Sequence, residues 1–448
     1  MVARKFFGTD GIRGPWGSKA ICPSFFRAIG WAFGNFLLRR GGTKFFLGQD
    51  GRSSGDALQA ALIEGLPKRI SPLLGGVLPS PAISFAARFF AADGAVAITA
   101  SHNSSEDNGI KFFDGQGRKW SERDEADLEE LICSKLCSGL EWGSNSTRAA
   151  VDCHEEALVA YRSHWRNILP SNCLHGKKIV LDTANGSFSA IGADLLTSLG
   201  AEVISMANRP SGRNINLGCG SEHPNSLCEF VRCTGSDWGL AVDGDGDRAV
   251  VCDRTGIPLP GEHLFARVAL YFRKIGILTP VVTTAIANGA LDRHLASFQV
   301  PVLRVAVGDR NVAEAMELHG SHFGGEPSGH FLWTGAGPTA DGLLAGALFF
   351  STFSGAPLDV PWQFPLRPTA SENIALKKIF PLERAHRFGE MQKKAENALN
   401  SNGRVLARYS GTESKLRLIV EAVDGRMASH WLKELRAAFL LDLADEGY

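Results

Sequence analysis

The chain has 448 residues, 44% of them hydrophobic and 21% charged, which is ordinary for a folded globular protein and argues against extended disorder. Lys plus Arg and Asp plus Glu both number 47, so the formal net charge is zero. Such a chain has no global attraction to nucleic acid or to an anionic membrane, and we expect neither as a partner. An anionic ligand must therefore be bound by a local site.

Three further features predict a cytoplasmic protein. No apolar run approaches the ~20 residues that a membrane-spanning helix needs, and the first eight residues lack the apolar core of a signal peptide. The nine cysteines are an odd number without a Cys-x-x-Cys pair, which is typical of reduced structural thiols.

In chain order, a short β-rich run, a polar turn containing glycine and a helical pattern recur together three times. The β-rich runs are residues 44–47, 179–181 and 281–284. Strands that alternate with helices predict α/β layers with largely parallel pairing, and the recurrence indicates a triplicated α/β unit.

The rest of the chain is divided by polar segments rich in Gly or Pro, which lie at residues 139–146, 253–261 and 354–368. Beyond the last of these the pattern predicts a helix over 382–399, strands over 404–408 and 415–420, and a helix over 428–443, typical of a smaller α+β domain. At roughly 150 residues per domain the length fits three or four domains. The predicted domains are 1–145, 150–255, 256–366 and 369–448.

The first chemical motif is the loop TASHN, residues 99–103, after a strand-like segment. A serine at the end of a buried strand is suited to act as a nucleophile or phosphate carrier, so Ser101 is the candidate, with His102 and Lys111 as sources of charge or protons. Taken alone, the loop is better explained as a turn or a helix cap.

The second motif is DGDGDR, residues 243–248, between two strand-like runs. Glycines let the loop curl so that Asp243, Asp245 and Asp247 converge, and a cation must offset their repulsion. Hard oxygen ligands indicate Mg²⁺ or Ca²⁺. A calcium-binding helix-loop-helix is excluded because Arg248 and Arg254 stand where it needs Gly and Glu. Arg248 beside the loop indicates that an anion binds there too.

The third motif is GGEPSGH, residues 324–330. Glu326 and Ser328 offer an acceptor and a donor for vicinal sugar hydroxyls, and His330 is a candidate proton carrier. A turn with a capping serine is the alternative interpretation.

The fourth motif is RYSGTES, residues 408–414, between two predicted strands. Backbone amides, hydroxyls and guanidinium groups can surround a phosphate here, or the segment can be a plain hairpin turn. The candidate phosphate-binding residues are Arg408, Ser410, Gly411, Thr412 and Arg417.

These four motifs, together with FGTDGIRG at residues 7–14 and EDNGIKFF at 106–113, resemble the α-D-phosphohexomutase superfamily, and the resemblance runs nearly end to end. It implies three similar α/β domains with mixed sheets around a central cleft, plus a smaller C-terminal α+β domain. It also implies an isomerase that interconverts sugar 1-phosphates and 6-phosphates through a phosphoserine and a sugar 1,6-bisphosphate.

The resemblance further implies the role of each candidate residue. Ser101 would carry the phosphate and contact one Mg²⁺ per chain, which Asp243, Asp245 and Asp247 would hold. Lys111 and His330 would transfer protons, with Arg13, His102 and Arg248 near the reacting phosphate. A sugar-phosphate substrate and a homodimer are the implied partners.

Three short segments are similar to the branch of the superfamily that acts on glucosamine phosphate, and they are NIN at 214–216, CGS at 219–221 and VGDR at 307–310. That activity would feed amino-sugar nucleotide and cell-wall precursor synthesis. Pro327 stands where that branch usually has Gln, so a phosphoglucomutase or phosphomannomutase remains the alternative within the class. A catalytically silent protein that binds phosphosugars or metal is the alternative outside it.

Overall fold

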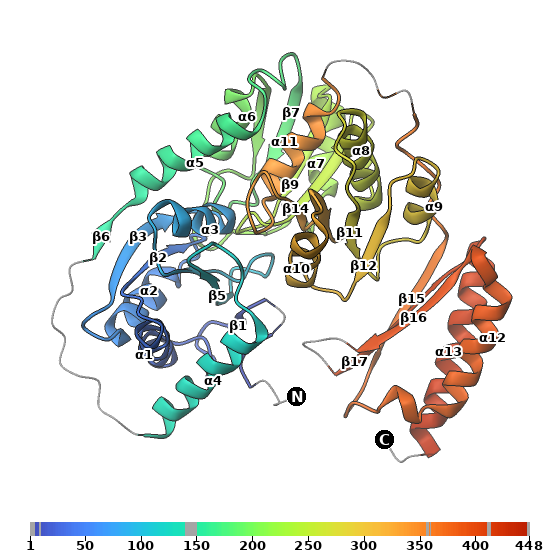
Figure 1. The fold of residues 1–448 in the computed structure, drawn as a ribbon, viewed down its shortest axis with the longest axis horizontal. Helices are drawn as coiled ribbons and strands as arrows, with labels where there is room; N and C mark the ends of the chain where they lie inside the picture. Colours follow the sequence, from blue (N-terminus) through green and yellow to red (C-terminus); the bar gives the residue numbers. More distant parts are fainter. Residues whose placement is uncertain are drawn as a thin grey trace.

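The computed structural model describes residues 5–8, 10–138, 150–354, 358, 360–409 and 414–445. The chain forms four units, each built on its own β-sheet. Figure 1 shows three of them together and the fourth, coloured orange to red, at the lower right beside the unit that contains β11 and β12.

The first unit is a six-stranded sheet in the order β1-β5-β4-β2-β3-β6. Its strands are β1 (Ile12–Pro15), β2 (Lys44–Gln49), β3 (Ser71–Val77), β4 (Gly94–Ile98), β5 (Asp107–Asp114) and β6 (Val151–Asp152). Its helices are α1 (Pro23–Arg39), α2 (Gly55–Gly65), α3 (Ser80–Phe89) and α4 (Glu122–Cys137). Strand β4 is buried throughout, as expected for a strand covered on both faces.

The second and third units each contain a four-stranded sheet. The second comprises α5 (His154–Ile168), β7 (Lys178–Asp182), α6 (Gly192–Ser198), β8 (Glu202–Met206), α7 (Asn225–Thr234), β9 (Trp238–Val242) and β10 (Ala249–Asp253). The third comprises α8 (Gly261–Lys274), β11 (Val281–Thr284), α9 (Ala290–Ala296), β12 (Val302–Val305), α10 (Asp309–His319), β13 (Phe323–Gly325), β14 (Phe331–Trp333) and α11 (Gly342–Ser351).

The three sheets share the topology of four strands, to which the first sheet adds β1 and β6 at its edges, and this confirms the predicted triplication and the mixed α/β class. In each, the first strand of the repeat (β2, β7 or β11) pairs in parallel with the next two strands of the repeat. The third strand then pairs antiparallel with a fourth, giving the hairpins β4-β5, β9-β10 and β13-β14. The three β-rich runs seen in the sequence are thus the equivalent inner strands of three equivalent sheets.

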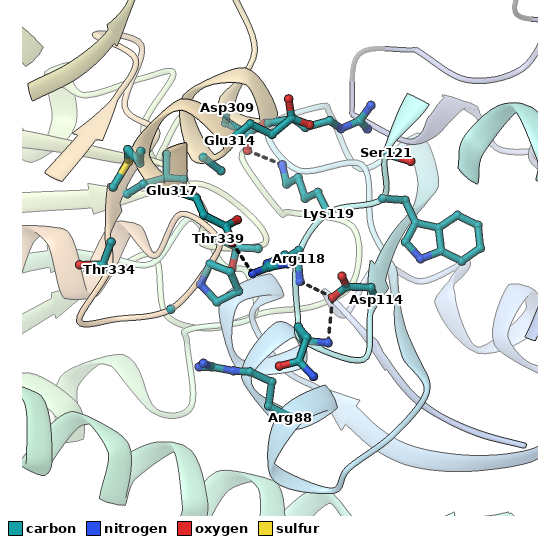
Figure 2. Close-up of a pocket in the computed structure, with 18 of the residues that line it drawn as sticks. Arg88, Asp114, Arg118, Lys119, Ser121, Asp309, Glu314, Glu317, Thr334 and Thr339 are labelled. Atoms are coloured by element: carbon teal, nitrogen blue, oxygen red, sulfur yellow. Dashed lines mark hydrogen bonds and ion pairs between the residues drawn. The ribbon is translucent and has the colours of Figure 1, made fainter. Parts of the chain in front are cut away.

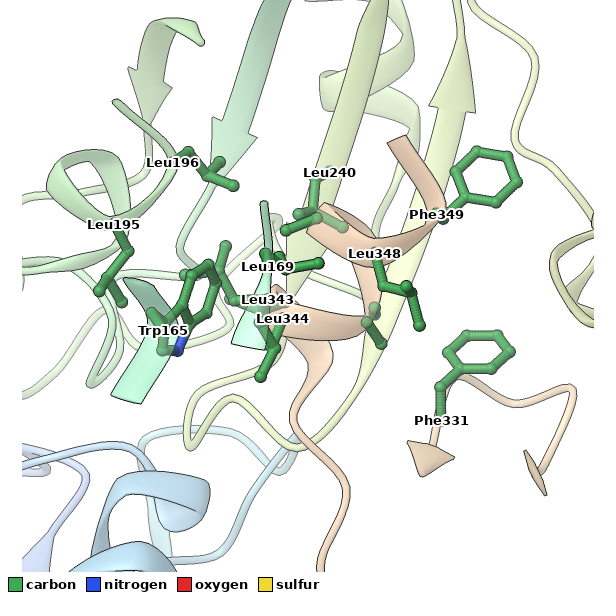
Figure 3. Close-up of a cluster of buried hydrophobic side chains, with 14 of the residues drawn as sticks. Trp165, Leu169, Leu195, Leu196, Leu240, Phe331, Leu343, Leu344, Leu348 and Phe349 are labelled. Carbon is green, nitrogen blue, oxygen red and sulfur yellow. The ribbon is translucent and has the colours of Figure 1, made fainter. Parts of the chain in front are cut away.

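The largest hydrophobic core joins the first three units, and helix α11 packs against the sheet of the second unit as well as against its own (Figure 3). Leu344 and Leu348 of α11 lie in one buried cluster with Leu240 of β9 and Trp165 of α5. Helix α11 is buried all round, which explains why its sequence is apolar without a polar face.

Truncation of Leu240 in this cluster is expected to destabilise the protein strongly. The side chain is 0% exposed, so Leu240→Ala should lower the free energy of unfolding by about 2–5 kcal/mol, through lost burial and the cavity left behind. Leu217→Ala, at a side chain that is 74% exposed, is the control and should change it by less than about 0.5 kcal/mol. Urea unfolding of both variants measures the difference, and equal stabilities would contradict the placement of Leu240 in the core.

The fourth unit is a three-stranded antiparallel sheet, β15-β17-β16, packed on two helices. Its elements are β15 (Thr369–Ala375), η1 (Leu382–Arg384), α12 (His386–Leu399), η2 (Asn400–Asn402), β16 (Arg404–Tyr409), β17 (Lys415–Glu421) and α13 (Gly425–Asp445). This confirms the smaller α+β domain and adds β15, an edge strand whose mostly exposed, polar residues gave no strand signal. Across the described residues, no helix combines the length and the apolar character needed to span a bilayer.

Candidate active site

The first three predicted motifs occupy the same topological position in the three repeats. The serine loop joins β4 to β5, the acidic loop joins β9 to β10, and the loop containing residues 326–330 joins β13 to β14. Each therefore connects the third strand of its repeat to the fourth. The contacts below bring side chains of all three loops together.

Ser101 lies at the junction of the first and second units. It is fully buried, and its φ of 52° lies in the left-handed region, which non-glycine residues rarely adopt. Its Oγ donates a hydrogen bond to Asp243 Oδ2 at 2.5 Å and lies 3.3 Å from His102 Nδ1. The serine hydroxyl thus directly contacts the acidic loop, an arrangement in keeping with what the resemblance implies for Ser101.

The three carboxylates of the acidic loop form one buried cluster. Asp243, Asp245 and Asp247 each offer one oxygen, and these oxygens lie within 4.8 Å of one another. A Cβ at Gly244 would come within 2.8 Å of Ser101 O, so glycine there lets the loop approach the serine. Burial, followed by the charges of Asp247 and Asp245, raises the pKa of Asp243 to about 7. The cluster concentrates negative charge that a cation would balance.

The donors of this cluster fit a divalent cation. Asp243, Asp245 and Asp247 are at most 2% exposed, and Asp245 Oδ1 is buried without a hydrogen-bond partner in the described part of the chain. Carboxylate and hydroxyl oxygens are ligands that Mg²⁺ accepts. Among the described His, Cys, Asp and Glu residues, no other group of three or more is arranged in this way. Ser101 Oγ is the predicted fourth ligand.

Lys111 of β5 brings positive charge to the acidic cluster. Its Nζ lies 2.7 Å from Asp245 Oδ2, 2.6 Å from Asp247 Oδ2 and 3.1 Å from Asp10 Oδ2. Burial by itself would lower the pKa of Lys111, but the charges of Asp10, Asp245 and Asp247 outweigh it and hold that pKa well above its usual range. Arg13 joins the same group through an ion pair with Asp10.

Lys119 links this group to the third unit. Its Nζ lies 2.7 Å from Asp10 Oδ1 and 2.5 Å from Asp309 Oδ2, at the start of α10. A cavity of about 540 Å³ lies between the first and third units, with Lys119 and Asp309 in its wall (Figure 2). Arg118 reaches across that cavity to Glu317, with Nη2 and Oε1 2.8 Å apart.

His330 connects the acidic loop to the predicted sugar loop. Its Nε2 lies 3.3 Å from Asp247 Oδ1 and its Nδ1 lies 3.3 Å from Glu326 Oε2. Burial lowers the pKa of His330, but the charge and hydrogen bond of Asp247 and the hydrogen bond of Glu326 raise it to about 9. Glu326 is also fixed through Oε1, which accepts a hydrogen bond from Gly308 N at 3.2 Å. Ser328 is exposed on the same loop.

Arg248 and His102 lie beside Ser101 and the acidic cluster. Arg248 N donates to Asp243 Oδ1 at 3.1 Å, and its guanidinium places Nη1 2.7 Å from Glu222 Oε1 and Nε 3.4 Å from His330 Nε2. Burial, together with the charges of Arg248 and then Arg13, lowers the pKa of His102 to about 4, so this imidazole is neutral near pH 7.

Only part of the fourth motif can be placed, because Ser410, Gly411 and Thr412 lie outside the described residues. Arg408 of β16 faces Arg417 of β17 as its cross-strand partner. Burial, then the charge of Arg417, lowers the pKa of Arg408, while Glu326 opposes the shift. Two guanidinium groups on one face of the sheet suit an anion, and Arg408 lies within electrostatic range of the sugar loop.

Several polar residues of the site were not predicted from the sequence. Asp10, Lys119, Asp309 and Glu222 complete its ion pairs. Asp10 and Asp309 do lie in the quoted motifs FGTDGIRG and VGDR, whereas nothing in the sequence around Lys119 or Glu222 singles them out.

The comparisons with known proteins agree with this geometry. The four models of the phosphoglucomutase/phosphomannomutase family match in chain order: α/β/α domain I at residues 4–136, domain II at 160–256, domain III at 260–359 and the C-terminal domain at 370–438. A phosphoglucosamine mutase from Nitratiruptor sp. is 34% identical over 440 residues, covering 96% of this chain and 98% of that protein.

Solved structures share the fold. The chain is similar to a phosphoglucomutase/phosphomannomutase family protein from Burkholderia thailandensis, with a TM-score of 0.81, 22% identity, and 99% of this chain and 98% of that one covered. It is also similar to N-acetylphosphoglucosamine mutase from Aspergillus fumigatus in complex with GlcNAc-6P and magnesium, with a TM-score of 0.62, 16% identity, and coverage of 97% and 95%. The family models and the full-length relative together confirm the resemblance, and the chain belongs to the phosphoglucomutase/phosphomannomutase family.

Proposed function

We propose that this enzyme interconverts glucosamine 6-phosphate and glucosamine 1-phosphate, with Ser101 as the phosphate carrier and a glucosamine 1,6-bisphosphate as the intermediate. The observation that carries the proposal is the 2.5 Å hydrogen bond from Ser101 Oγ to Asp243, inside a cluster of three buried carboxylates. The full-length relative named phosphoglucosamine mutase supports glucosamine as the sugar.

In the proposed reaction, the phosphoryl group leaves Ser101 Oγ and bonds to a free hydroxyl oxygen of the bound sugar phosphate. That hydroxyl loses its proton to a base, and Ser101 Oγ recovers a proton. The resulting bisphosphate turns over, and its other phosphoryl group returns to Ser101 by the same exchange of bonds in reverse. The sugar is therefore released with its phosphate on the other carbon.

The chain's own residues would neutralise charge, transfer protons and bind the substrate. Lys111, held as an ammonium by three carboxylates, and Arg248 and Arg13 would neutralise charge on the transferring group. His330 and Lys111 are the proposed proton carriers. Arg408 and Arg417, with Ser410, Gly411 and Thr412, would bind the phosphate that is not reacting, and Glu326 and Ser328 would bind ring hydroxyls.

We assign one Mg²⁺ to Asp243, Asp245, Asp247 and Ser101. A divalent cation at these oxygens supplies electrostatic stabilisation to the transferring phosphoryl group. The buried, unpartnered Asp245 Oδ1 and the all-oxygen donor set support this assignment. The magnesium present in the Aspergillus neighbour supports it further.

Access to Ser101 requires movement, since the residue is fully buried in this conformation. The neighbouring His102 and Arg248 are only partly buried. We therefore propose that these side chains or the units that carry them shift when substrate binds, and that the closed site keeps water from the phosphoserine.

The sugar is tested by measuring kcat/KM, with Mg²⁺ present, on the 1-phosphates of glucosamine, N-acetylglucosamine, glucose and mannose. We expect glucosamine 1-phosphate to be preferred by at least about 10-fold, the discrimination that one buried polar contact provides. A preference for glucose or mannose would instead favour a phosphoglucomutase or phosphomannomutase. No turnover of any of the four would favour a silent binding protein.

Four further predictions belong to this proposal. We propose domain boundaries at 1–145, 150–255, 256–366 and 369–448. We also expect a homodimer, and light scattering would measure its molar mass. We also propose that the reaction takes place in the cytoplasm. The product would enter amino-sugar nucleotide and cell-wall precursor synthesis.

A further inference from the structure

Four backbone carbonyls of the serine loop and the first residue of β5 accept hydrogen bonds from a single guanidinium, that of Arg52. Its side chain is 0% exposed. The four acceptors are the carbonyl oxygens of Ser101, Asn103, Ser104 and Asp107. The fifth N–H, on Nε, bonds Asp50 Oδ2 at 2.8 Å, so every donor of the guanidinium has an acceptor.

Asp50 extends this network to the backbone amide of the carrier serine. Thr99 Oγ1 donates to Asp50 Oδ2 at 2.7 Å and accepts a hydrogen bond from Ser101 N at 2.8 Å. Both backbone polar groups of Ser101 are therefore fixed, which accounts for a left-handed residue at the reacting position.

A second side chain reaches the same carbonyls from the other side of the unit boundary. Asn216, in the segment between β8 and α7, donates from Nδ2 to Ser101 O at 2.8 Å and to Asn103 O at 2.9 Å. The side chain is buried, with 7% of the residue exposed. Both partners are carbonyl oxygens, so the side chain there must donate two hydrogen bonds, as the NH₂ group of Asn216 does. Asn216 belongs to the unit that carries the acidic cluster, whereas the carbonyls belong to the unit that carries the serine.

We infer that Asn216 is a positioning residue, which holds the serine loop in register with the acidic cluster so that Ser101 Oγ stays in line with Asp243. Arg52 holds the same carbonyls from within the first unit. Neither side chain touches the reacting atoms, and the inference rests on the proposed role of Ser101 as carrier. Phosphoryl transfer depends on the alignment of the reacting atoms, and a displacement of these atoms by about 1 Å lowers the rate roughly 100-fold.

The test compares Asn216→Ala with Asn214→Ala, a matched control on the same segment. The amide of Asn214 bonds within its own loop, to Arg209 O at 3.0 Å and Ser211 N at 2.8 Å. We expect Asn216→Ala to lower kcat by about 30- to 100-fold with KM changed less than about threefold. Asn214→Ala should lower kcat by less than about threefold, the size expected where no group near the reacting atoms moves.

Hydrogen exchange supplies a readout that does not depend on turnover. In Asn216→Ala, amides of residues 99–108 should exchange faster than in the unsubstituted chain, and in Asn214→Ala they should not. Replacement of Arg52 is a weaker test, because it leaves buried Asp50 unpaired and endangers folding. Asn216→Asp, which replaces the NH₂ group by a charged acceptor, should be at least as impaired as Asn216→Ala.

Three results would decide the matter. If Asn214→Ala and Asn216→Ala have equal kcat and equal exchange rates, the inference is overturned. The bonds from Asn216 to the serine loop would then matter no more than any other contact within the segment. Faster exchange of the serine loop with an unchanged kcat would overturn the positioning role. Faster exchange and lower kcat at 216 alone would support it. If the unsubstituted chain does not turn over glucosamine phosphates, the proposed substrate is refuted. The exchange measurement needs no sugar, so it would still test whether Asn216 stabilises the serine loop.

Discussion

Replacement of Ser101 by Ala is expected to lower kcat by on the order of 10⁴-fold or more, because the group that carries the phosphate is removed. The fold should persist, since Ala occupies the left-handed position at a cost similar to that of Ser. The loss of the hydrogen bond from Ser101 Oγ to Asp243 should lower the free energy of unfolding by about 1–3 kcal/mol. Steady-state rates and thermal unfolding measure the two effects separately.

The phosphate itself can be followed by intact mass in the same experiment. After exposure to glucose 1,6-bisphosphate, the unsubstituted chain should gain one phosphoryl group and Ser101→Ala should gain none. Ser104→Ala, an exposed position on the same loop, is the control and should behave as the unsubstituted chain does. Near-normal turnover of Ser101→Ala would refute the carrier role.

Replacement of Asp245 by Ala is expected to abolish both activity and the response to Mg²⁺. A ligand that binds only the folded state stabilises it by about 2.7 kcal/mol at 100 times its Kd, so Mg²⁺ should raise the Tm of the unsubstituted chain. One lost carboxylate from a three-carboxylate site should remove most of that increase. Thermal unfolding with Mg²⁺ and with a chelator measures the effect without any substrate.

Asp194→Ala provides the control for this experiment. Asp194 lies in the same unit, its side chain is 68% exposed, and it pairs with Arg162 at the surface. Its replacement should leave both the Mg²⁺ titration and the activity unchanged. An unaltered Mg²⁺ response in Asp245→Ala would contradict the assignment of the metal ligands.

Most of the fold was predictable because its signals are local. Short apolar runs followed by Gly-containing turns marked β2, β7 and β11, which are the equivalent inner strands of three equivalent sheets. Strand β15 was missed because an edge strand with exposed alternating residues resembles a polar linker. The packing of α11 against the second sheet was also not readable, since an apolar helix shows that it is buried but not against what.

The residues of the site also fall into two groups, those that the sequence predicted and those that it did not. Ser101 and the three aspartates stand in compact motifs whose residue types already indicate their chemistry. Lys119, Glu222 and Asn216 act through single side chains from distant segments, and a lone Lys, Glu or Asn has many possible roles. No pattern around Lys119 or Glu222 separates them from ordinary surface residues, and the NIN motif that contains Asn216 did not indicate its bonds to the serine loop.

The sequence by itself determined the repeat, the four motifs and the kind of chemistry, because strand periodicity, glycine-containing turns and clustered carboxylates are properties of neighbouring residues. Only the tertiary structure decided which loops meet. It brought Ser101 Oγ to within 2.5 Å of an aspartate 142 residues away, and it showed the serine loop bonded from both units. Contacts of that kind depend on how the units pack, and packing is fixed by surfaces assembled from many separate segments.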